Sequence, residues 1–360
     1  MLVNNIKYKT IWLNSSKKVI IIDQTLLPFN FKEVELKTLD CVINAIVEMQ
    51  VRGAPLIGVT AAFGIYLAVK SSNQDNHIVD AGKRLVETRP TAINLNWAVN
   101  RIIKILLETS LSDREEKALS VANIMWKEDQ EINEKIGIFG AEEINKIYKK
   151  IDRPVNILTH CNAGWLATVD WGTATAPIYK ARDMGIPLHV WVDETRPRNQ
   201  GSYLTAFELK HEFINHTIIT DNTGGHLMQN GLVDLVITGS DRTTYTGDVC
   251  NKIGTYLKAL AAYDNDIPFY VALPSSTIDW DTNNGNQIKI EKRDENEVHY
   301  IKGVNEYNEI QNIRVTPKNT KAANYAFDVT PRKYITSLIT EFGLIEPNEN
   351  KILDIKKIKK

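Results

Sequence analysis

The stretch VNILTHCNAG (residues 155–164) joins a short apolar run to a small polar loop, which is the pattern of a buried strand followed by a turn. Four more apolar runs follow, and helical patterns separate them. The runs cover 188–192, 217–220, 232–238 and 268–273, and the helical patterns cover 172–184, 202–213, 223–229 and 251–263. Short strands that alternate with helices predict parallel βαβ units, so we expect an α/β fold with a doubly wound parallel sheet.

The residues before this segment predict a different kind of secondary structure. A small β element at 8–36 precedes helical patterns that begin at Thr38 and continue to about residue 150. These patterns cover 55–70, 77–87, 92–108, 113–135 and 138–149. We therefore expect an N-terminal β lead-in and helical domain at 1–150 and the α/β domain at 151–345.

The C-terminal part of the chain adds three expectations. Residues 279–325 are polar and irregular, which is typical of a hairpin excursion. The residues 325–329 and a helix after Pro331 are expected to return to the fold. The basic tail, residues 346–360, is expected to be frayed and solvated, because it is a run of lysines at the end of the chain.

The composition limits the class of protein. Of 360 residues, 43% are hydrophobic and 24% charged, and the net charge is −1, so nothing favours a nucleic-acid or membrane partner. The three cysteines form no CxxC pair, which argues against a zinc site or a disulfide framework. The N-terminus lacks an apolar signal core, and the apolar stretch 57–69 fits a buried helix. We expect a cytoplasmic protein without a metal.

Three polar segments follow predicted strands, where ligands bind in open α/β sheets. They are His160–Gly164, Asp193–Pro197 and Gly239–Arg242. Cys161 and Asp241 are thus expected to face one crevice. The alternative for each is structural, because a single cysteine is often a small core residue and an aspartate after a strand often caps a helix.

An anion site is also indicated. Arg52-Gly53-Ala54-Pro55 opens a predicted helix, and small residues at a helix N-terminus let backbone N–H groups approach a phosphate. Arg89 precedes another helix, and Asn251-Lys252 is expected to open the helix after the fourth strand. The alternative for each is an ordinary surface charge or cap. There is no Walker or GxGxxG motif, so nucleotide binding has no specific support.

Two other groups admit a functional and a structural interpretation. His160 has the chemistry of a general base, but its tight polar loop favours a bond to the backbone. The Asp193-Glu194 pair invites a metal, yet no histidine stands at ligand spacing, and Arg196 is expected to pair with one of the two carboxylates.

Eight collinear segments between residues 20 and 340 carry a family pattern. They are IIDQTLLP (21–28), AIVEMQVRGAPLIGVTAAFG (45–64), TRPTAINLNWA (88–98), ILTHCNAGWLAT (157–168), DETRPRNQGSYLTAFEL (193–209), TGSDRTTYTGDVCNKIGTY (238–256), IPFYVALPSSTID (267–279) and FDVTP (327–331). In these segments the sequence resembles the methylthioribose-1-phosphate isomerases. That family is related to the regulatory subunits of translation initiation factor 2B and to the archaeal ribose-1,5-bisphosphate isomerases.

The resemblance implies a helical N-terminal domain, a Rossmann-like catalytic domain, a homodimer, a sugar-phosphate substrate and no cofactor. It implies that Cys161 and Asp241 are catalytic. It further implies a set of substrate-binding residues: Arg52, Gly53, Ala54, Arg89, Gln200, Asn251 and Lys252. The implied reaction is the conversion of 5-methylthioribose-1-phosphate to 5-methylthioribulose-1-phosphate in methionine salvage.

Some positions depart from the family pattern. Trp165 stands where a small residue is usual, and Trp171 adds a second indole. Ser240, Thr243, Thr244 and Cys250 also replace more apolar or smaller residues. Three other functions therefore stay open: an isomerase of 5-deoxyribose-1-phosphate, an isomerase of ribose-1,5-bisphosphate, and a non-catalytic regulatory subunit. We expect the tryptophans either to pack in the core or to form an apolar wall that raises the pKa of Asp241.

Overall fold

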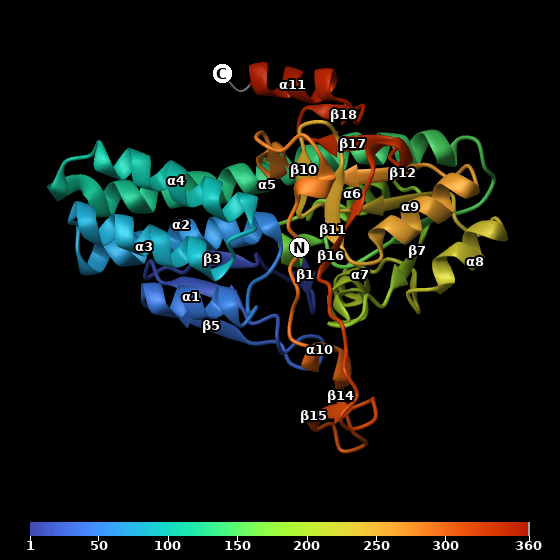
Figure 1. Cartoon of the computed structure of the whole chain (residues 1–360), viewed down its shortest axis with the longest axis horizontal. Coiled ribbons are helices and arrows are strands. Elements are labelled where there is room, and N and C mark those ends of the chain that lie inside the picture. Colours follow the sequence, from blue (N-terminus) through green and yellow to red (C-terminus); the bar gives the residue numbers. More distant parts are fainter. Residues whose placement is uncertain (359–360) are drawn as a thin grey trace.

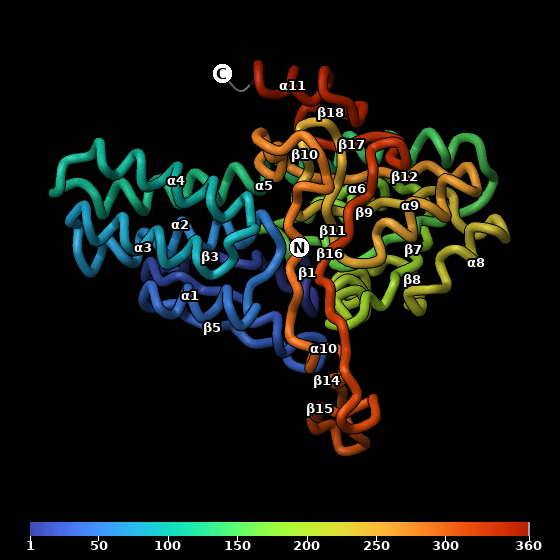
Figure 2. The backbone as a smooth tube through the Cα atoms, in the orientation of Figure 1, coloured from blue at the N-terminus to red at the C-terminus, as the bar shows by residue number. Residues whose placement is uncertain are grey.

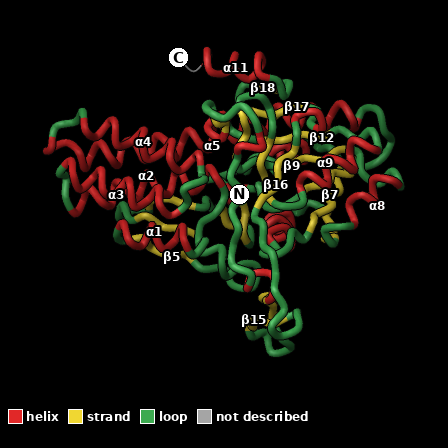
Figure 3. The backbone as a smooth tube through the Cα atoms, in the orientation of Figure 1, coloured by secondary structure: helices red, strands yellow, loops and turns green. Residues whose placement is uncertain are grey.

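The computed structural model describes residues 1–358 of the chain. Two parts lie side by side (Figure 1): a bundle of helices, and a sheet with helices on both of its faces. Figure 3 shows helices gathered in the first part and the long strands in the second. This architecture confirms the predicted α/β fold class.

Short strands precede the helical part, as the sequence predicts. β1 (Leu2–Val3) pairs antiparallel with β2 (Ile6–Lys7). A second antiparallel sheet contains β3 (Ile11–Leu13), β4 (Val19–Ile22) and β5 (Glu33–Leu36). β4 is buried along its whole length, because the helical part and the α/β part both pack against it.

The helical part is built around one apolar helix. α1 (Leu39–Val47) begins at Thr38, whose hydroxyl accepts from the Cys41 N–H at 3.3 Å. It is followed by α2 (Ala54–Ser71), α3 (Asp75–Thr88) and α4 (Ile93–Leu107). α2 is long and apolar enough to cross a membrane, but 78% of its 18-residue window is buried inside the molecule. The prediction of a buried core helix is therefore confirmed.

One long helix joins the two parts. α5 (Arg114–Tyr148) runs unbroken for 35 residues, whereas the sequence predicted two helices with a break near 136. Gly137 and Gly140 lie at the expected break but serve close packing: a Cβ on Gly140 would lie 2.4 Å from Pro177 Cγ. The glycines let α5 approach α6 (Ala176–Asp183), so contact with the α/β part keeps the helix continuous.

The main sheet has seven strands in the order β18-β17-β12-β9-β6-β7-β8. Six are parallel, and β18 is antiparallel to β17. Their bounds are β6 (Val155–Thr159), β7 (Leu188–Asp193), β8 (His216–Ile219), β9 (Leu235–Thr238), β12 (Phe269–Ala272), β17 (Ser337–Thr340) and β18 (Gly343–Ile345). The strand order reverses between β6 and β9, so the crevice expected at a doubly wound sheet lies at their carboxyl ends.

Helices cover both faces of this sheet. Alternate residues of a strand point to opposite faces, so Ile157 of β6 packs with α5, α6 and α7 (Ala206–His211), whereas Leu158 packs with α8 (Thr223–Gln229) and α9 (Thr255–Asp264). A five-residue π-helical segment, Gly201–Thr205, precedes α7. The predicted helices at 172–184 and 202–213 are therefore present but shorter or less regular than expected.

A smaller sheet carries part of the predicted anion site. It contains β13 (Ile278–Asp279), β10 (Arg242–Thr244), β11 (Val249–Lys252) and β16 (Phe327–Thr330) in that order. Asn251 and Lys252 end β11 and pair with Asp328 and Phe327, so the prediction that they open a helix is wrong. The helix α9 begins three residues later, because the β11–β16 pairing keeps this segment extended.

The polar excursion is confirmed as a hairpin. Figure 2 traces the chain away from the small sheet and back into β16. The excursion contains α10 (Asn296–His299) and the hairpin of β14 (Tyr300–Val304) and β15 (Ile310–Arg314). The helix expected after Pro331 is only a single turn at residues 332–334, because the chain enters β17 directly.

The described part of the C-terminal tail, residues 346–358, packs against the α/β part. α11 (Glu349–Ile358) packs Ile352 and Ile355 into the core on the α9 side of the sheet. The expectation of a solvated tail is therefore wrong for these residues, because two isoleucines among the lysines give the helix an apolar face. Residues 359–360 of the tail lie outside the described part.

Candidate active site

A pocket of about 60 Å³ lies in the crevice between the helical part and the carboxyl ends of β6 and β9. Of the nine residues expected to form the site, eight line it: Arg52, Gly53, Ala54, Arg89, Cys161, Gln200, Asp241 and Lys252. Asn251 does not line it. Its amide instead donates to Thr255 Oγ1 at 3.0 Å, at the beginning of α9.

Cys161 follows β6 and is held by the polypeptide on both sides. Its N–H donates to Thr195 Oγ1 at 2.8 Å, and its carbonyl accepts from Thr205 Oγ1 at 2.7 Å. These bonds hold the residue in the left-handed region, with a φ of +66°, which costs energy for a cysteine. The sulfur lies 3.5 Å from Gln200 Oε1, to which the thiol donates.

The thiol is neutral in this environment. Burial raises the pKa of Cys161, and the charge of Asp241 raises it further, while Arg52 and Lys252 oppose the shift. Cys161 is therefore a thiol, and the positive charges of Arg52 and Lys252 would stabilise its thiolate form.

Asp241 follows β9, and its N–H donates to the Cys250 carbonyl at 3.0 Å. Burial raises the pKa of the Asp241 carboxyl, and the charges of Lys252, Arg52 and Arg89 oppose that shift. A carboxyl with a raised pKa keeps a proton at higher pH than an exposed one, so Asp241 has the character of a general acid.

Cationic side chains gather around the N-terminus of α2, where the sequence predicts an anion site. Lys252 is 8% exposed, and burial lowers its pKa, while Cys161 and Asp241 raise it. Arg89 lies 3.8 Å from Glu291, and its buried Nε has no hydrogen-bond partner among the described residues. Such an unpaired donor beside a helix N-terminus fits an anionic ligand.

Arg52 is fixed by the loop that follows β6. Both terminal nitrogens donate to Asn162, one to its side-chain oxygen and one to its carbonyl at 2.7 Å. The Asn162 amide nitrogen in turn donates to Glu208 at 2.8 Å. Gly53, the next residue, has a φ of +92°, and a Cβ there would lie 2.5 Å from Ala167. Only glycine lets α2 begin this close to the loop.

His160 has a structural position. Its Nδ1 lies 2.8 Å from Asp193 Oδ2 and its Nε2 lies 2.8 Å from the Ile253 carbonyl, and it does not line the pocket. His160, Asp193 and Asp221 place ligand atoms within 4.8 Å of one another. Lys258 Nζ lies 3.1 Å from Asp193 Oδ2, so an ammonium group already supplies the positive charge there.

Arg196 corrects another expectation. Its guanidinium donates to the carbonyls of Pro197 and Val298 at 2.9 and 2.8 Å, and not to Asp193 or Glu194. Asp193 is instead paired by His160 and Lys258. Proximity in the sequence therefore predicted the wrong partner, because the Arg196 side chain points toward the excursion, where Val298 lies.

Neither tryptophan forms the wall of the pocket. Trp165 is fully buried and belongs to the core that contains α5, α6 and α7. Trp171 lies beneath Lys180, whose Nζ is 3.8 Å from the ring centroid, and borders a groove near the N-terminus. The packing interpretation therefore holds for Trp165, and its unusual size does not act on the pocket directly.

Several residues of the pocket have no counterpart in the sequence prediction. These additional lining residues include Met49, Arg198, Lys289 and Arg293. Arg198 lies in a family segment and could have been found from its position two residues before Gln200. Arg293 lies in the irregular excursion, where only the fold brings it back over the site.

The Initiation factor 2 subunit family matches residues 50–347. The chain therefore belongs to this family.

Within it, a methylthioribose-1-phosphate isomerase of Escherichia coli O45:K1 is 54% identical over 97% of this chain and 94% of its own length. A second, of Sinorhizobium medicae, is 55% identical over 96% of each chain. The chain belongs with these methylthioribose-1-phosphate isomerases.

Two solved structures share the fold over nearly the whole chain. A 5-methylthioribose 1-phosphate isomerase from Pyrococcus horikoshii OT3 superposes with a TM-score of 0.84, at 36% identity over 98% of this chain and 96% of that one. A structure described as translation initiation factor eIF-2B, subunit delta, from A. fulgidus superposes with a TM-score of 0.81, at 37% identity over 97% and 100%.

Proposed function

We propose that the protein isomerises 5-methylthioribose-1-phosphate to 5-methylthioribulose-1-phosphate, a step of methionine salvage. The observation that carries the proposal is the convergence in one pocket of a thiol, a carboxyl with a raised pKa and a group of cations. Full-length relatives with this activity in their name, 54% identical, support the same substrate.

The substrate sets the chemical problem. Its phosphate is on the anomeric oxygen, so the sugar ring cannot open freely to an aldehyde. Opening needs a proton on the ring oxygen, and hydrogen must then move from C2 to C1 while the C2 hydroxyl becomes a ketone. The enzyme therefore needs an acid, a base and a site that excludes water.

Asp241 and Cys161 are assigned these proton transfers. Protonated Asp241 delivers its proton to the ring oxygen, and its carboxylate then accepts the proton of the C2 hydroxyl. Hydrogen reaches C1 by one of two routes. In a hydride shift, C2–H moves with its electron pair to C1, and Cys161 polarises the developing charge. Through an enol phosphate, the Cys161 thiol first loses its proton to solvent before the substrate binds; the thiolate, which Arg52 and Lys252 stabilise, then removes the C2 proton and returns a proton to C1.

The cations hold the phosphate and orient the sugar. Arg52, Arg89 and Lys252 line one end of the pocket together with the first turn of α2. Phosphate contacts exist in both the ground state and the transition state, so their role is mainly to bind and to align the reacting carbon atoms.

A turnover assay tests the proposal. Purified protein is incubated with 5-methylthioribose-1-phosphate, 5-deoxyribose-1-phosphate and ribose-1,5-bisphosphate, and ketose formation is followed. We expect the methylthio sugar to give the highest kcat/KM, and activity to persist after exhaustive chelation. Higher turnover of another sugar would reassign the substrate. Absence of turnover with all three, together with a stable complex with translation-factor subunits, would favour the regulatory alternative.

The same assay in D2O separates the two routes of hydrogen transfer. Product without deuterium at C1 supports the hydride shift, and product with deuterium at C1 supports the enol phosphate. We also propose that the enzyme acts in the cytoplasm as a homodimer, as the family resemblance implies. Light scattering of the purified protein at micromolar concentration tests the second point.

A further inference from the structure

His160 follows β6 directly and precedes Cys161, and its imidazole ring is buried outside the catalytic pocket. The residue is 1% exposed, and each ring nitrogen has one partner at 2.8 Å. Nδ1 contacts Asp193 Oδ2, and Nε2 contacts the Ile253 carbonyl. The ring therefore joins three segments of the α/β part that are distant in sequence.

Both atoms that contact the ring are hydrogen-bond acceptors. A backbone carbonyl has no proton to donate, so Nε2 must carry one. Asp193 Oδ2 also lies 3.1 Å from the ammonium group of Lys258, which has donors only, so this oxygen accepts from both neighbours. Nδ1 of His160 must then carry a proton as well. A neutral imidazole has a single N–H, so the two contacts together fit an imidazolium ion.

The surrounding charges favour this ion. Three carboxylates, those of Asp193, Asp221 and Asp328, lie around two buried cations, His160 and Lys258. Asp328 accepts from two backbone N–H groups at the start of α9, at 2.7 and 3.1 Å. Burial raises the pKa of Asp328, and these bonds and the charges of His160 and Lys258 oppose that shift. A buried cation needs such pairing, because removal from water is costly for an unpaired charge.

The contact at Nε2 holds the segment that carries a cation of the catalytic pocket. Ile253 follows Lys252, whose side chain lines the pocket. Gly254, the next residue, has a φ of +102°, and a Cβ there would lie 3.0 Å from the His160 ring. The ring thus packs directly against this segment and determines how closely it approaches the loop after β6.

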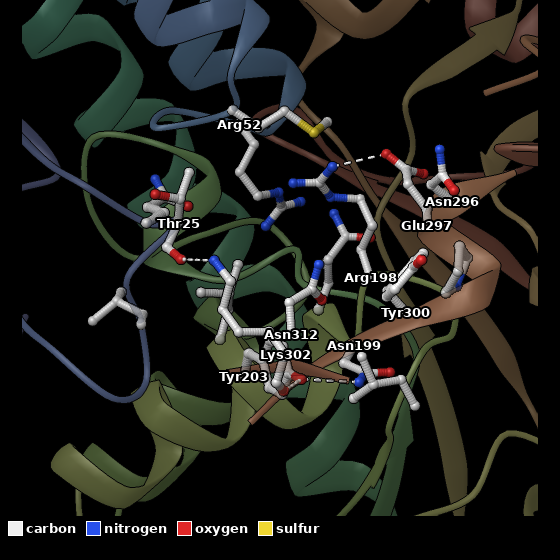
Figure 4. A pocket seen from close by; sticks show the side chains of 17 residues that line it. Thr25, Arg52, Arg198, Asn199, Tyr203, Asn296, Glu297, Tyr300, Lys302 and Asn312 are labelled. Carbon is white, nitrogen blue, oxygen red and sulfur yellow. Dashed lines mark hydrogen bonds and ion pairs between the residues drawn. The ribbon is translucent and has the colours of Figure 1, made fainter. Parts of the chain in front are cut away.

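The contact at Nδ1 holds the thiol. Asp193 ends β7, and its carbonyl accepts from the Thr195 hydroxyl at 3.1 Å. The same hydroxyl accepts from the Cys161 N–H at 2.8 Å and helps to hold this residue at its positive φ. Figure 4 shows Arg198, further along the loop, beside Arg52, and both line the catalytic pocket. A displacement of Asp193 would therefore move the thiol and the wall of the pocket.

We propose that His160 is a positioning residue that acts as a buried imidazolium ion, with Asp193 as its counter-ion, and that it fixes the separation between the Cys161 thiol and the Lys252 ammonium. The effect on turnover rests on the proposed function, whereas the protonation state of the ring does not. Hydrogen bonds from a charged donor are stronger than neutral ones, which suits contacts that hold a cysteine in a strained conformation.

NMR of the ring nitrogens tests the protonation state. The protein is labelled with ¹⁵N at its seven histidines, and the shift and attached proton of each ring nitrogen are recorded at neutral pH. The signals that disappear in His160→Asn and His160→Gln assign this residue. We expect two protonated nitrogens with similar shifts for His160. A ring nitrogen without a proton would overturn the imidazolium ion, whatever the activity of the enzyme.

The same two variants separate the two contacts of the ring. Asparagine places an N–H near the position of Nδ1, so His160→Asn retains the contact to Asp193 and loses that to Ile253. Glutamine reaches the position of Nε2, so His160→Gln retains Ile253 and loses Asp193. His189→Asn is the matched control, because this histidine lies on β7 and contacts only Thr217 through its ring nitrogens.

We expect His160→Asn to raise KM for 5-methylthioribose-1-phosphate about tenfold or more with a smaller effect on kcat, because it releases the Lys252 segment, whose phosphate contact exists in both the ground state and the transition state. His160→Gln should lower kcat about tenfold or more with a smaller effect on KM, because it releases the thiol. His189→Asn should change neither value.

Equal changes of KM and kcat in both His160 variants, accompanied by lower melting temperatures, would reduce His160 to a stabilising residue and overturn the positioning role. Unchanged kinetics in folded variants would overturn it as well. A wild-type protein that converts no sugar phosphate would overturn the proposed function and the effect on turnover, and the NMR result would still decide the protonation state.

Discussion

Cys161 and Asp241 follow β6 and β9, two strands that pair directly at the point where the strand order reverses. Each is held by its own backbone bonds, so a substitution of its side chain should leave the loop intact. We expect Cys161→Ser and Asp241→Asn each to lower kcat by about a hundredfold or more, because acid–base groups typically contribute 10²–10⁴. Near-normal kcat in either variant would remove that residue from the mechanism.

Glu208 is a positioning residue for Arg52. Its carboxylate accepts from the Asn162 amide, the Trp165 and Leu166 N–H groups, and the Tyr179 hydroxyl, all at 2.8–3.1 Å. The Asn162 amide must therefore turn its oxygen toward Arg52. Glu208→Gln replaces one acceptor oxygen with an N–H donor. The Asn162 amide should then rotate, so that its nitrogen and not its oxygen faces Arg52.

We expect Glu208→Gln to raise KM several-fold more than it lowers kcat, because Arg52 binds phosphate in both the ground state and the transition state. Glu212→Gln is the matched control, since this buried carboxylate on the same face binds Arg182 and not the catalytic loop. An equal rise of KM in both variants would show that the effect is only one of stability.

At the scale of an element, the N-terminus of α2 depends on Gly53. An alanine there combines a positive φ with a Cβ at 2.5 Å from Ala167. We expect Gly53→Ala to move the first turn of α2 away from the catalytic loop and to weaken the binding of substrate and inorganic phosphate at least tenfold.

Gly185→Ala provides the comparison for this glycine. Its φ is +76°, but a Cβ there has nothing within 4 Å. It should cost about 1 kcal/mol of stability through backbone strain and leave phosphate binding unchanged. Similar phosphate affinities in the two variants, measured by calorimetry, would contradict a role for the α2 N-terminus.

Element boundaries show where sequence patterns stop being sufficient. The strands β6, β7, β9 and β12 lie close to the expected ranges, because a short buried strand carries its own apolar signal. The patterns failed at α5, where packing against Pro177 overrides the glycines, and at Asn251-Lys252, where pairing with β16 keeps the chain extended. In both cases the partner is distant in sequence.

At the scale of the whole molecule, Asp129 links α5 to the catalytic part. It is 8% exposed and accepts from the Val169 N–H at 2.7 Å. Burial raises its pKa to about 7, whereas in the unfolded chain it is near its ordinary value of about 3.9. The folded state therefore holds the proton between these two pH values. The stability that this contributes is complete below the unfolded pKa and is lost as the pH rises through the folded one.

We expect the unfolding free energy of the wild type, relative to Asp129→Asn, to fall as the pH rises from 5 to 7, by at most about 1.4 kcal/mol per pH unit. The asparagine imitates the protonated carboxyl and keeps an acceptor for Val169. Urea denaturation at several pH values measures the difference, with Asp80→Asn on an exposed part of α3 as control. A difference that stays constant from pH 5 to 7 would show that Asp129 is already ionised in the folded state at pH 5.

From the sequence alone we predict the α/β class, the helical first part, the family and most residues that line the candidate pocket. These follow from local signals: apolar periodicity, the polar loops after strands, and collinear motifs such as ILTHCNAGWLAT. Cys161, Gln200 and Asp241 meet in one pocket because parallel strands bring their carboxyl ends to one edge of the sheet, whereas the helical part supplies Arg52, Gly53, Ala54 and Arg89 and the small sheet supplies Lys252.

Only the tertiary structure decided what encloses that pocket and what each side chain contacts. The excursion carries no periodic pattern, yet it folds back to place Arg293 in the pocket wall and Glu297 at 2.8 Å from both Arg198 and Arg293. The sequence left Trp165 open between core packing and a pocket wall, and the structure buries it fully in the core. Contacts of this kind join residues about a hundred positions apart, and their energies depend on the packed surface around them and not on local sequence.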